Sequence, residues 1–215
     1  TKNGIIKKTP ASEYESIRKS GKIAITLKEG DELISIFKTT GNDNIFLATR
    51  NGMAICFNEN DARAVGRTAS GVKAIDLADG DYVVGAEPVR EDSKVLLVTD
   101  GGYGKCTDLT SFRIQHRGGK GLKAYKITEK TGNIIGISMV NDSEELIMVT
   151  SEGVVIRIRI KDIATTTGRI TQGVRLINLD DGVTVVSMDK ISAEDAVEEE
   201  SEENNTEVTT ETTEE

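Results

Sequence analysis

The feature that most constrains the fold is an internal repeat with a period of about fifty residues. The pattern Thr-x-x-Gly begins at Thr1, Thr49, Thr99 and Thr150, and its glycines are separated by 48, 50 and 51 residues. Each copy then contains a second glycine and a third turn. These elements are Gly21, Gly71, Gly121 and Gly173, and the turns at 30–31, 80–81, 132–133 and 181–182. A period of this length with several strands per unit is typical of propeller blades.

Apolar runs predict the strands of each unit. Residues 45–48, 95–98 and 146–149 are continuously apolar, which predicts strands buried on both faces. Thr-x-x-Gly predicts a hairpin turn, and Asn51-Gly52 favours type I′ geometry. The remaining predicted strands include 154–160, 72–77, 174–179, 33–36 and 183–186, and helical turns are expected only near 61–63 and 161–163.

Four strands per unit predict an all-β, propeller-like domain over residues 1–190, with about four visible blades. The first unit lacks the apolar strand that precedes the threonine elsewhere, because the sequence begins at Thr1. Four blades are also the low end for a closed propeller. We therefore expect an incomplete ring whose upstream sequence is missing.

Charge divides the chain into a basic body and an acidic end. The net charge is −9, but residues 194–215 contain eleven acids and no base, which leaves 25 acids and 27 bases in residues 1–193. Residues 191–215 are Glu-, Asn- and Thr-rich with few apolar residues, which predicts a disordered tail. This tail is either a solubiliser or a mimic of nucleic acid beside a basic face.

The stretch from Gln115 to Gly121, Gln-His-Arg-Gly-Gly-Lys-Gly, is the strongest candidate site. Glycine allows backbone N–H groups to approach a ligand, and Arg and Lys suit phosphate groups. A loop of this kind can hold an anion in a backbone concavity. Weaker versions of the stretch recur along the chain, which indicates a role shared by the units.

Basic residues recur at fixed offsets from the repeat glycines. If the units are blades, equivalent positions lie at equal radius, and these charges form a band around the rim. A curved positive band suits a bent duplex held by its phosphates, without reading of base sequence. The alternative is that polar strand faces simply carry Lys and Arg. The predicted duplex-binding residues are Lys7, Lys8, Arg18, Lys19, Arg67, Lys73, Lys105, Gln115, Arg117, Gly118, Gly119, Lys120, Gly121, Lys123, Arg157, Arg159, Arg169 and Arg175.

The sequence does not support other kinds of site. His116 is the only histidine, so a His-based triad or a multi-histidine metal site is excluded. Cys56 and Cys106 occupy equivalent strand positions, which predicts core thiols in a reducing cytosol. No apolar run is long enough to span a bilayer, and no recognition helix, zinc motif or aromatic platform is found. We therefore expect no catalytic residue, metal, cofactor or membrane partner in this stretch of chain.

Residues 115–121 resemble the box motif of the DNA gyrase A subunit. The segments 1–9, 30–33 and 171–174 are also similar to the C-terminal domain of that subunit. The resemblance covers residues 1 to about 190, and an acidic end is similar to that family as well.

This resemblance implies a six-bladed β-pinwheel that wraps double-stranded DNA with positive handedness. The four units would be blades three to six, and residues 115–121 would be the fifth-blade version of a box that defines the first blade. The wrap feeds a duplex segment into the cleavage gate, so that ATP-driven strand passage introduces negative supercoils. The implied partners are the gyrase B subunit, together with the rest of the gyrase A subunit, in a heterotetramer of two copies of each, in the bacterial cytoplasm with the nucleoid. ATP, Mg²⁺ and the catalytic tyrosine belong to other parts of that complex.

Two alternatives remain open. The related topoisomerase IV protein, which decatenates and relaxes DNA, has a similar C-terminal domain that lacks an intact first box. A propeller that serves as a protein-interaction scaffold would have no DNA role. Binding through several phosphates weakens steeply with salt, and a scaffold predicts no such dependence.

Overall fold

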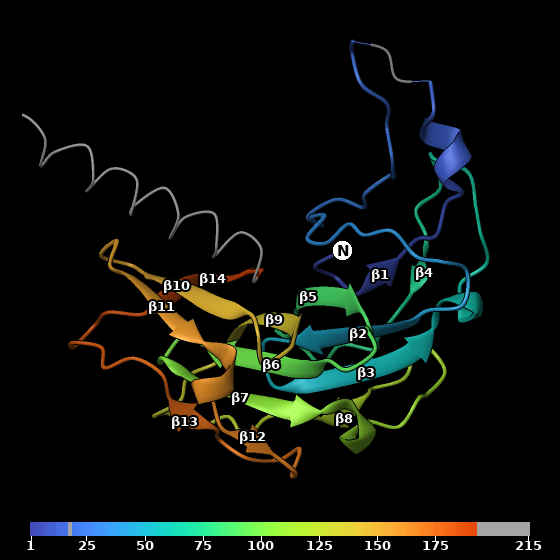
Figure 1. Cartoon of the computed structure of the whole chain (residues 1–215). Helices are drawn as coiled ribbons and strands as arrows, with labels where there is room; N and C mark the ends of the chain where they lie inside the picture. The colour runs from blue at the N-terminus through green and yellow to red at the C-terminus, as the bar shows by residue number, and fades with distance from the viewer. Residues whose placement is uncertain (17–18, 193–215) are drawn as a thin grey trace, which may run out of the picture.

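The computed structural model describes residues 1–16 and 19–192, which form β-strands and short 3-10 turns (Figure 1). The strands are β1 (Ile5–Ile6), β2 (Asn44–Thr49), β3 (Met53–Asn58), β4 (Val72–Lys73), β5 (Val83–Pro88), β6 (Lys94–Thr99), β7 (Tyr103–Asp108), β8 (Leu122–Lys123), β9 (Ile134–Val140), β10 (Glu145–Thr150), β11 (Val155–Arg159), β12 (Thr165–Thr166), β13 (Val174–Arg175) and β14 (Val185–Ile191). The 3-10 turns are η1 (Ala11–Tyr14), η2 (Glu59–Asp61), η3 (Leu109–Ser111) and η4 (Ile160–Asp162). The all-β prediction is confirmed. Arg18 and residues 193–215 of the predicted acidic tail lie outside the described residues.

The hairpins β2–β3, β6–β7 and β10–β11 each turn at a Thr-x-x-Gly sequence. The Thr49 carbonyl accepts a hydrogen bond from the Gly52 N–H at 3.1 Å, and the Thr49 hydroxyl accepts one from the Met53 N–H at 3.2 Å. Gly52 has a φ of +86°, whereas the two residues before it do not adopt the left-handed conformation. The predicted type I′ turn is therefore wrong. The loop has three residues, and its geometry is a type I turn closed by a left-handed glycine.

In the second, third and fourth units, the short strand after the second glycine pairs with the preceding unit. β4 pairs with β1, β8 with β3 and β13 with β7, all antiparallel. Only two residues pair each time, where the sequence predicted longer strands over 72–77 and 174–179. In the second unit the pairing ends because Ala74 and Ile75 enter the hydrophobic core. This exchange ties successive units together through backbone hydrogen bonds and gives the sheets a β-pinwheel arrangement.

The last strand of each unit returns to its own hairpin. β5, β9 and β14 pair with β2, β6 and β10, the first strands of the three hairpins. Residues 33–36, predicted as the corresponding strand of the first unit, form no strand. The physical reason is that the first unit has no hairpin strand for this segment to pair with in the described chain.

Three hydrophobic clusters lie between successive sheets. Along β2, Ile45 and Leu47 pack toward the first unit, while Phe46 and Ala48 pack toward the third. β6 alternates in the same way, so the predicted burial on both faces is confirmed for β2 and β6. β10 differs because Ile147 is only half-buried, since no further described sheet covers that face.

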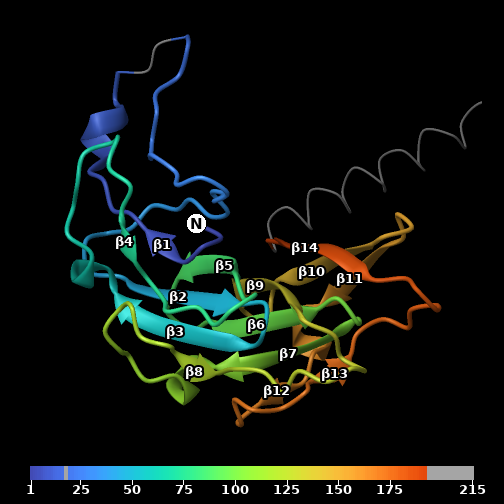
Figure 2. The same ribbon diagram turned by 180° about the vertical axis from the view of Figure 1, so that it is seen from behind.

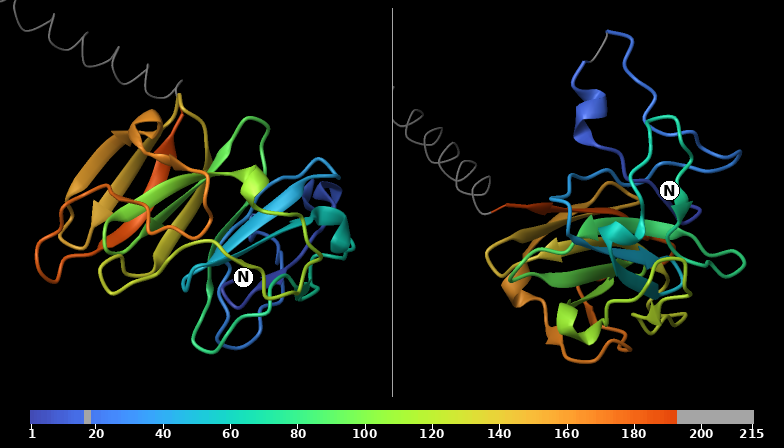
Figure 3. Two further views of the ribbon diagram at one scale, coloured as in Figure 1. Left: turned by 90° about the horizontal axis from the view of Figure 1, so that it is seen from below. Right: turned by 90° about the vertical axis from the view of Figure 1, so that its right-hand side faces the viewer.

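The sheets follow one another in chain order along an arc (Figure 3). Both Figure 1 and Figure 2 place β5, β9 and β14 side by side on the inner side of this arc. The exchanged strands β4, β8 and β13 lie on its outer side in the same two views. The long connections that precede these strands therefore run over the outside of the molecule.

Candidate nucleic-acid interface

The second, third and fourth units each carry one outer segment, which runs from the 3-10 turn to just beyond the exchanged strand. These are called the second (59–76), third (109–126) and fourth (160–178) outer segments. The third contains the Gln115–Gly121 motif, and its backbone is bonded to the preceding unit. The Gln115 N–H donates to Cys56 O at 2.8 Å, and the Gly118 N–H donates to Ala74 O at 2.6 Å. The motif therefore bridges the second and third units.

The glycines of the motif lie in two different environments: one is packed against a neighbouring backbone and two are open. Gly121 has a φ of +74°, and a Cβ there would lie 2.4 Å from Ala54 O, so its missing side chain admits the backbone of the preceding unit. Gly71 and Gly173 make the same close approach to the units before them. Gly118 and Gly119 have no atom within 3.5 Å of the corresponding Cβ position. Only these two glycines of the motif leave room for a ligand to approach the backbone.

The motif arginines point toward the preceding unit. Arg67, Arg117 and Arg169 are half-buried, and each donates to at least one backbone carbonyl of that unit. These contacts occupy some of the N–H donors of each guanidinium group. They do not test whether the arginines also contact a duplex, so that role stays a prediction. The sequence offered no sign of this inward orientation.

Two of the predicted lysines also face inward. Lys105 is fully buried, with its ammonium group 2.5 Å from Arg169 O and over the ring of Tyr125. Desolvation lowers its pKa to about 8. The prediction that Lys105 contacts a duplex is therefore wrong. Lys7, at the equivalent position, donates to Arg67 O at 2.6 Å and has a lowered pKa for the same reason of burial.

The cations of the exchanged strands face solvent. Lys73, Lys123 and Arg175 are exposed and hold the same register, opposite Ile5, Met53 and Tyr103 respectively. Because the three strands lie on the outer side of the arc, the structure brings these three cations to one curved surface. For this part of the predicted band, the strand register alone puts the three cations at equivalent positions.

The remaining predicted residues differ in their surroundings. Lys19 and Lys120 are exposed. Lys8 lies 3.3 Å from the buried Glu59 carboxylate, and it joins the first and second units. Arg157 pairs with Glu145, and Arg159 lies 2.9 Å from Asp162. The last three cations are thus engaged with acids, in contrast to Lys123 of the exchanged strands, for which no ion pair is found among the described residues.

The sequence analysis also missed exposed cations of the second and third outer segments. Arg63 and Arg113 follow η2 and η3 at equivalent positions, and Lys126 lies three residues after Lys123. The signal was available, because the third outer segment contains five Lys or Arg residues and no Asp or Glu. The second outer segment contains both Asp61 and Asp76. The third is therefore the most strongly basic of these surfaces.

In the second outer segment, Asp76 neutralises the positive charge of Lys73. Asp76 Oδ1 accepts a hydrogen bond from Lys73 Nζ at 2.7 Å, and this contact lowers the pKa of the Asp76 carboxyl. In the third segment Lys126 occupies the position of Asp76. Lys123 has no ion pair of this kind among the described residues, which leaves its charge directed to solvent.

Other chemistry finds little support in the described residues. Cys56 and Cys106 are buried, as predicted, and burial raises the pKa of each thiol to about 11. Such thiols are weak nucleophiles at neutral pH. His116 is almost fully exposed and lies 3.2 Å from Asp61. Among residues 1–16 and 19–192 there is no cluster of metal-ligating side chains, and no helix is long and apolar enough to cross a membrane.

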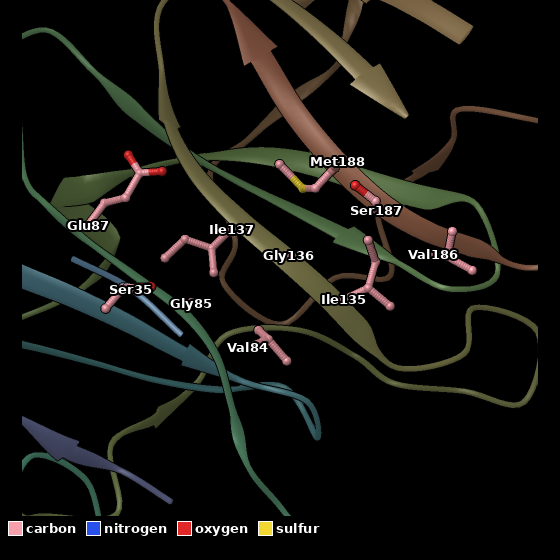
Figure 4. Close-up of a pocket in the computed structure, with 11 residues that line it drawn as sticks. Ser35, Val84, Gly85, Glu87, Ile135, Gly136, Ile137, Val186, Ser187 and Met188 are labelled. Atoms are coloured by element: carbon pink, nitrogen blue, oxygen red, sulfur yellow. The ribbon is translucent and has the colours of Figure 1, made fainter. Parts of the chain in front are cut away.

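The inner side of the arc contains a pocket of a different character (Figure 4). It lies between β5, β9 and β14, with Gly85, Gly136 and Ser187 at equivalent positions on the three strands. A Cβ at Gly136 would lie 2.6 Å from Met188, so the small residues permit close approach of neighbouring units. Of the described residues that line this pocket, only Glu87 carries a charged side chain. The pocket therefore does not suit a polyanion.

Strand-exchanged sheets along an arc, with cations gathered on the outer side, define the described residues as a β-pinwheel with a basic rim. The chain belongs to the family described as DNA gyrase C-terminal domain, beta-propeller, whose model matches residues 1–40, 43–90, 93–141 and 144–192. The four matches coincide with the four units and confirm the repeat.

Sequence relatives agree with this family. The chain is 57% identical over 195 residues to the DNA gyrase A subunit of Halalkalibacterium halodurans, with 91% of this chain and 23% of the relative covered. It is 54% identical over 196 residues to the DNA gyrase A subunit of Streptococcus pyogenes serotype M3, with 91% and 24% covered. The chain therefore spans about a quarter of the length of these relatives.

Solved structures of two kinds share the fold. The C-terminal domain of DNA topoisomerase IV has a TM-score of 0.85 at 28% identity, with 96% of this chain and 64% of that chain covered. The DNA gyrase A C-terminal domain has a TM-score of 0.77 at 26% identity, with 88% and 63% covered.

Proposed function

We propose that the chain binds and bends double-stranded DNA along its outer side, through phosphate contacts and without reading base sequence. The observation that carries this proposal is the third outer segment, where Arg113, Lys120, Lys123 and Lys126 are exposed with no acid in the segment. Lys73 and Arg175 continue the basic surface on the neighbouring units. A convex surface of this kind stabilises a curved duplex by backbone contacts, and the duplex supplies its own deformability.

The relatives, which are DNA gyrase A subunits, support a role within a larger enzyme. We propose that the described units form the wrapping part of such a protein, in a bacterial cytoplasm. Its partners would be the gyrase B subunit, together with the rest of the A subunit. The wrap would present a neighbouring duplex segment for ATP-dependent strand passage and so introduce negative supercoils. The predicted acidic tail and blade numbering remain part of this proposal.

Salt dependence provides the central test. Affinity of the complete protein for two duplexes of equal length and unrelated sequence is measured over a range of salt concentrations. We expect equal affinities and a slope of log K against log salt of about −0.9 for each phosphate contacted. A Lys120→Glu, Lys123→Glu double variant should bind both duplexes more weakly and show a shallower slope.

Salt-independent binding, or no binding to either duplex, would contradict duplex wrapping and favour a protein-interaction scaffold. A strong preference for one duplex would contradict phosphate-only recognition. A Lys28→Glu, Arg90→Glu double variant, which makes the same change in net charge at exposed positions outside the outer segments, controls for net charge alone.

A topoisomerase IV role is the second candidate, because the higher TM-score belongs to that C-terminal domain. The two sequence relatives are gyrase proteins, which favours gyrase. Incubation of the complete protein with its partner, ATP and relaxed plasmid distinguishes the two. Net negative supercoiling supports gyrase, and decatenation without it supports topoisomerase IV.

A further inference from the structure

The three motif arginines make the same contact at three successive unit boundaries. These contacts are Arg67 Nη1 to Ile23 O at 3.0 Å, Arg117 Nη1 to Lys73 O at 2.9 Å, and Arg169 Nε to Lys123 O at 3.3 Å. Each acceptor lies two residues after the second glycine of the preceding unit. The same donor and acceptor positions are therefore used three times.

At two boundaries the guanidinium group also reaches a second carbonyl. Arg117 Nε donates to Asp61 O at 2.8 Å, and Arg169 Nη1 donates to Ser111 O at 3.4 Å. Asp61 and Ser111 are equivalent residues at the ends of η2 and η3. Each of these arginines thus joins the beginning and the end of the preceding outer segment. A planar guanidinium with several N–H donors suits such a bridge better than an ammonium group does.

The arginine backbone is held by the preceding unit as well. The lysine contacts are Lys7 Nζ to Arg67 O at 2.6 Å and Lys105 Nζ to Arg169 O at 2.5 Å. At Arg117, where Ile55 replaces the lysine, the Arg117 N–H instead donates to the Asp61 carboxylate at 3.2 Å. Side chain and backbone of each arginine therefore both contact the unit before it.

We propose that Arg67, Arg117 and Arg169 are positioning residues, which set the spacing and angle between successive units so that the exposed cations follow a bent duplex. The half-burial of all three arginines supports this, since Lys73, Lys123 and Arg175 at the neighbouring offset are exposed. Bending DNA costs energy that depends on the imposed curvature. A change in the angle between units therefore alters the wrap even when every phosphate-binding charge is retained. This inference rests on the proposed duplex wrapping.

Charge-conserving substitution tests the inference in the complete protein. Arg117→Lys keeps the charge but cannot reproduce the planar bridge to two carbonyls, and Arg117→Gln removes both. The linking-number shift trapped by ligating nicked plasmid with bound protein reports the wrap. We expect Arg117→Lys to reduce the shift per bound chain about twofold or more, to the level of Arg117→Gln, because the imposed curvature changes. Its salt slope should remain close to that of the unchanged protein.

Arg90→Lys, the same substitution at an exposed arginine between β5 and β6 and away from the outer segments, is the matched control and should leave both the shift and the slope unchanged. If Arg117→Lys behaves as the unchanged protein while only Arg117→Gln is weakened, the arginine acts as a phosphate contact and the inference is overturned. Should Arg117→Lys fail to fold, Arg67→Lys, which alters the contact to the Ile23 carbonyl, is used with the same criteria.

The unchanged protein separates the two proposals. If it neither binds duplex nor shifts linking number, the proposed function fails. If it does both and the Arg117→Lys protein matches it, only the positioning inference fails.

Discussion

The third outer segment has two faces with different physical roles. Its inner face, formed by Gln115, Arg117 and Gly121, lies against the second unit and makes hydrogen bonds or close contacts to backbone carbonyls there. Its outer face presents Lys120 and Lys123 to solvent. Both faces come from one glycine-rich basic stretch. The recurrence of a cation along the chain therefore does not tell which face it occupies.

Substitutions on the inner face should destabilise the protein most. The largest expected loss of stability is at Gly121. A Cβ there meets the Ala54 carbonyl, and its φ of +74° disfavours any L residue. Gly121→Val should lower the free energy of unfolding by roughly 3 kcal/mol or more, through left-handed strain and a forced backbone shift. Urea unfolding measures the loss.

Gly119→Ala is the outer-face counterpart, since the nearest atom lies 3.9 Å from its Cβ position. It should change stability by about 0.5 kcal/mol or less. Equal losses in the two variants would erase the distinction between the faces.

A pH profile sharpens the distinction for buried cations. The pKa of Lys105, about 8, lies below its ordinary value of 10.5, so the unfolded chain binds more protons between these values. The free energy of unfolding therefore rises with pH above about 8. At lower pH, keeping Lys105 protonated in its buried position destabilises the folded state by at most about 3 kcal/mol. Above pH 9 the buried thiols, with raised pKa values, oppose this rise.

Stability curves from pH 7 to 9 for the unchanged chain and Lys105→Met should therefore differ in slope. The variant should lose most of the rise, although Lys7 contributes with the same sign. Lys123→Met, altered on the outer face, should keep the slope of the unchanged chain. Parallel curves for all three proteins would show that Lys105 is not held as described.

Exchanging charges between the second and third outer segments gives the smallest expected effect. Asp76→Lys should strengthen duplex binding, and Lys126→Asp should weaken it, each by only about a few-fold because the charges are exposed and screened by solvent. Salt titration of the complete protein measures both. Combining the two should restore near-original affinity, because net charge on the outer side is unchanged. Stability should hardly differ in any of the three, and a large stability loss would place these residues on the inner face.

Much of the fold could be predicted from local sequence. The period of the Thr-x-x-Gly turns and the apolar runs before them predicted the units, and β2, β6 and β10 were found there. The type I′ turn was predicted wrongly, because the Asn51-Gly52 pair outweighed the length of the loop. Exchange of the short strands between units was not predicted, because two-residue pairing leaves no periodic signal.

For the site, the sequence by itself determined which positions carry charge, including Lys73, Lys123 and Arg175 at equal offsets from the second glycine of their units. Only the tertiary structure decided that Arg117 bonds carbonyls and that Lys105 is buried. The physical reason is that a strand or turn defines the direction of a side chain relative to its own backbone. Whether solvent or a neighbouring unit lies in that direction depends on how the units pack.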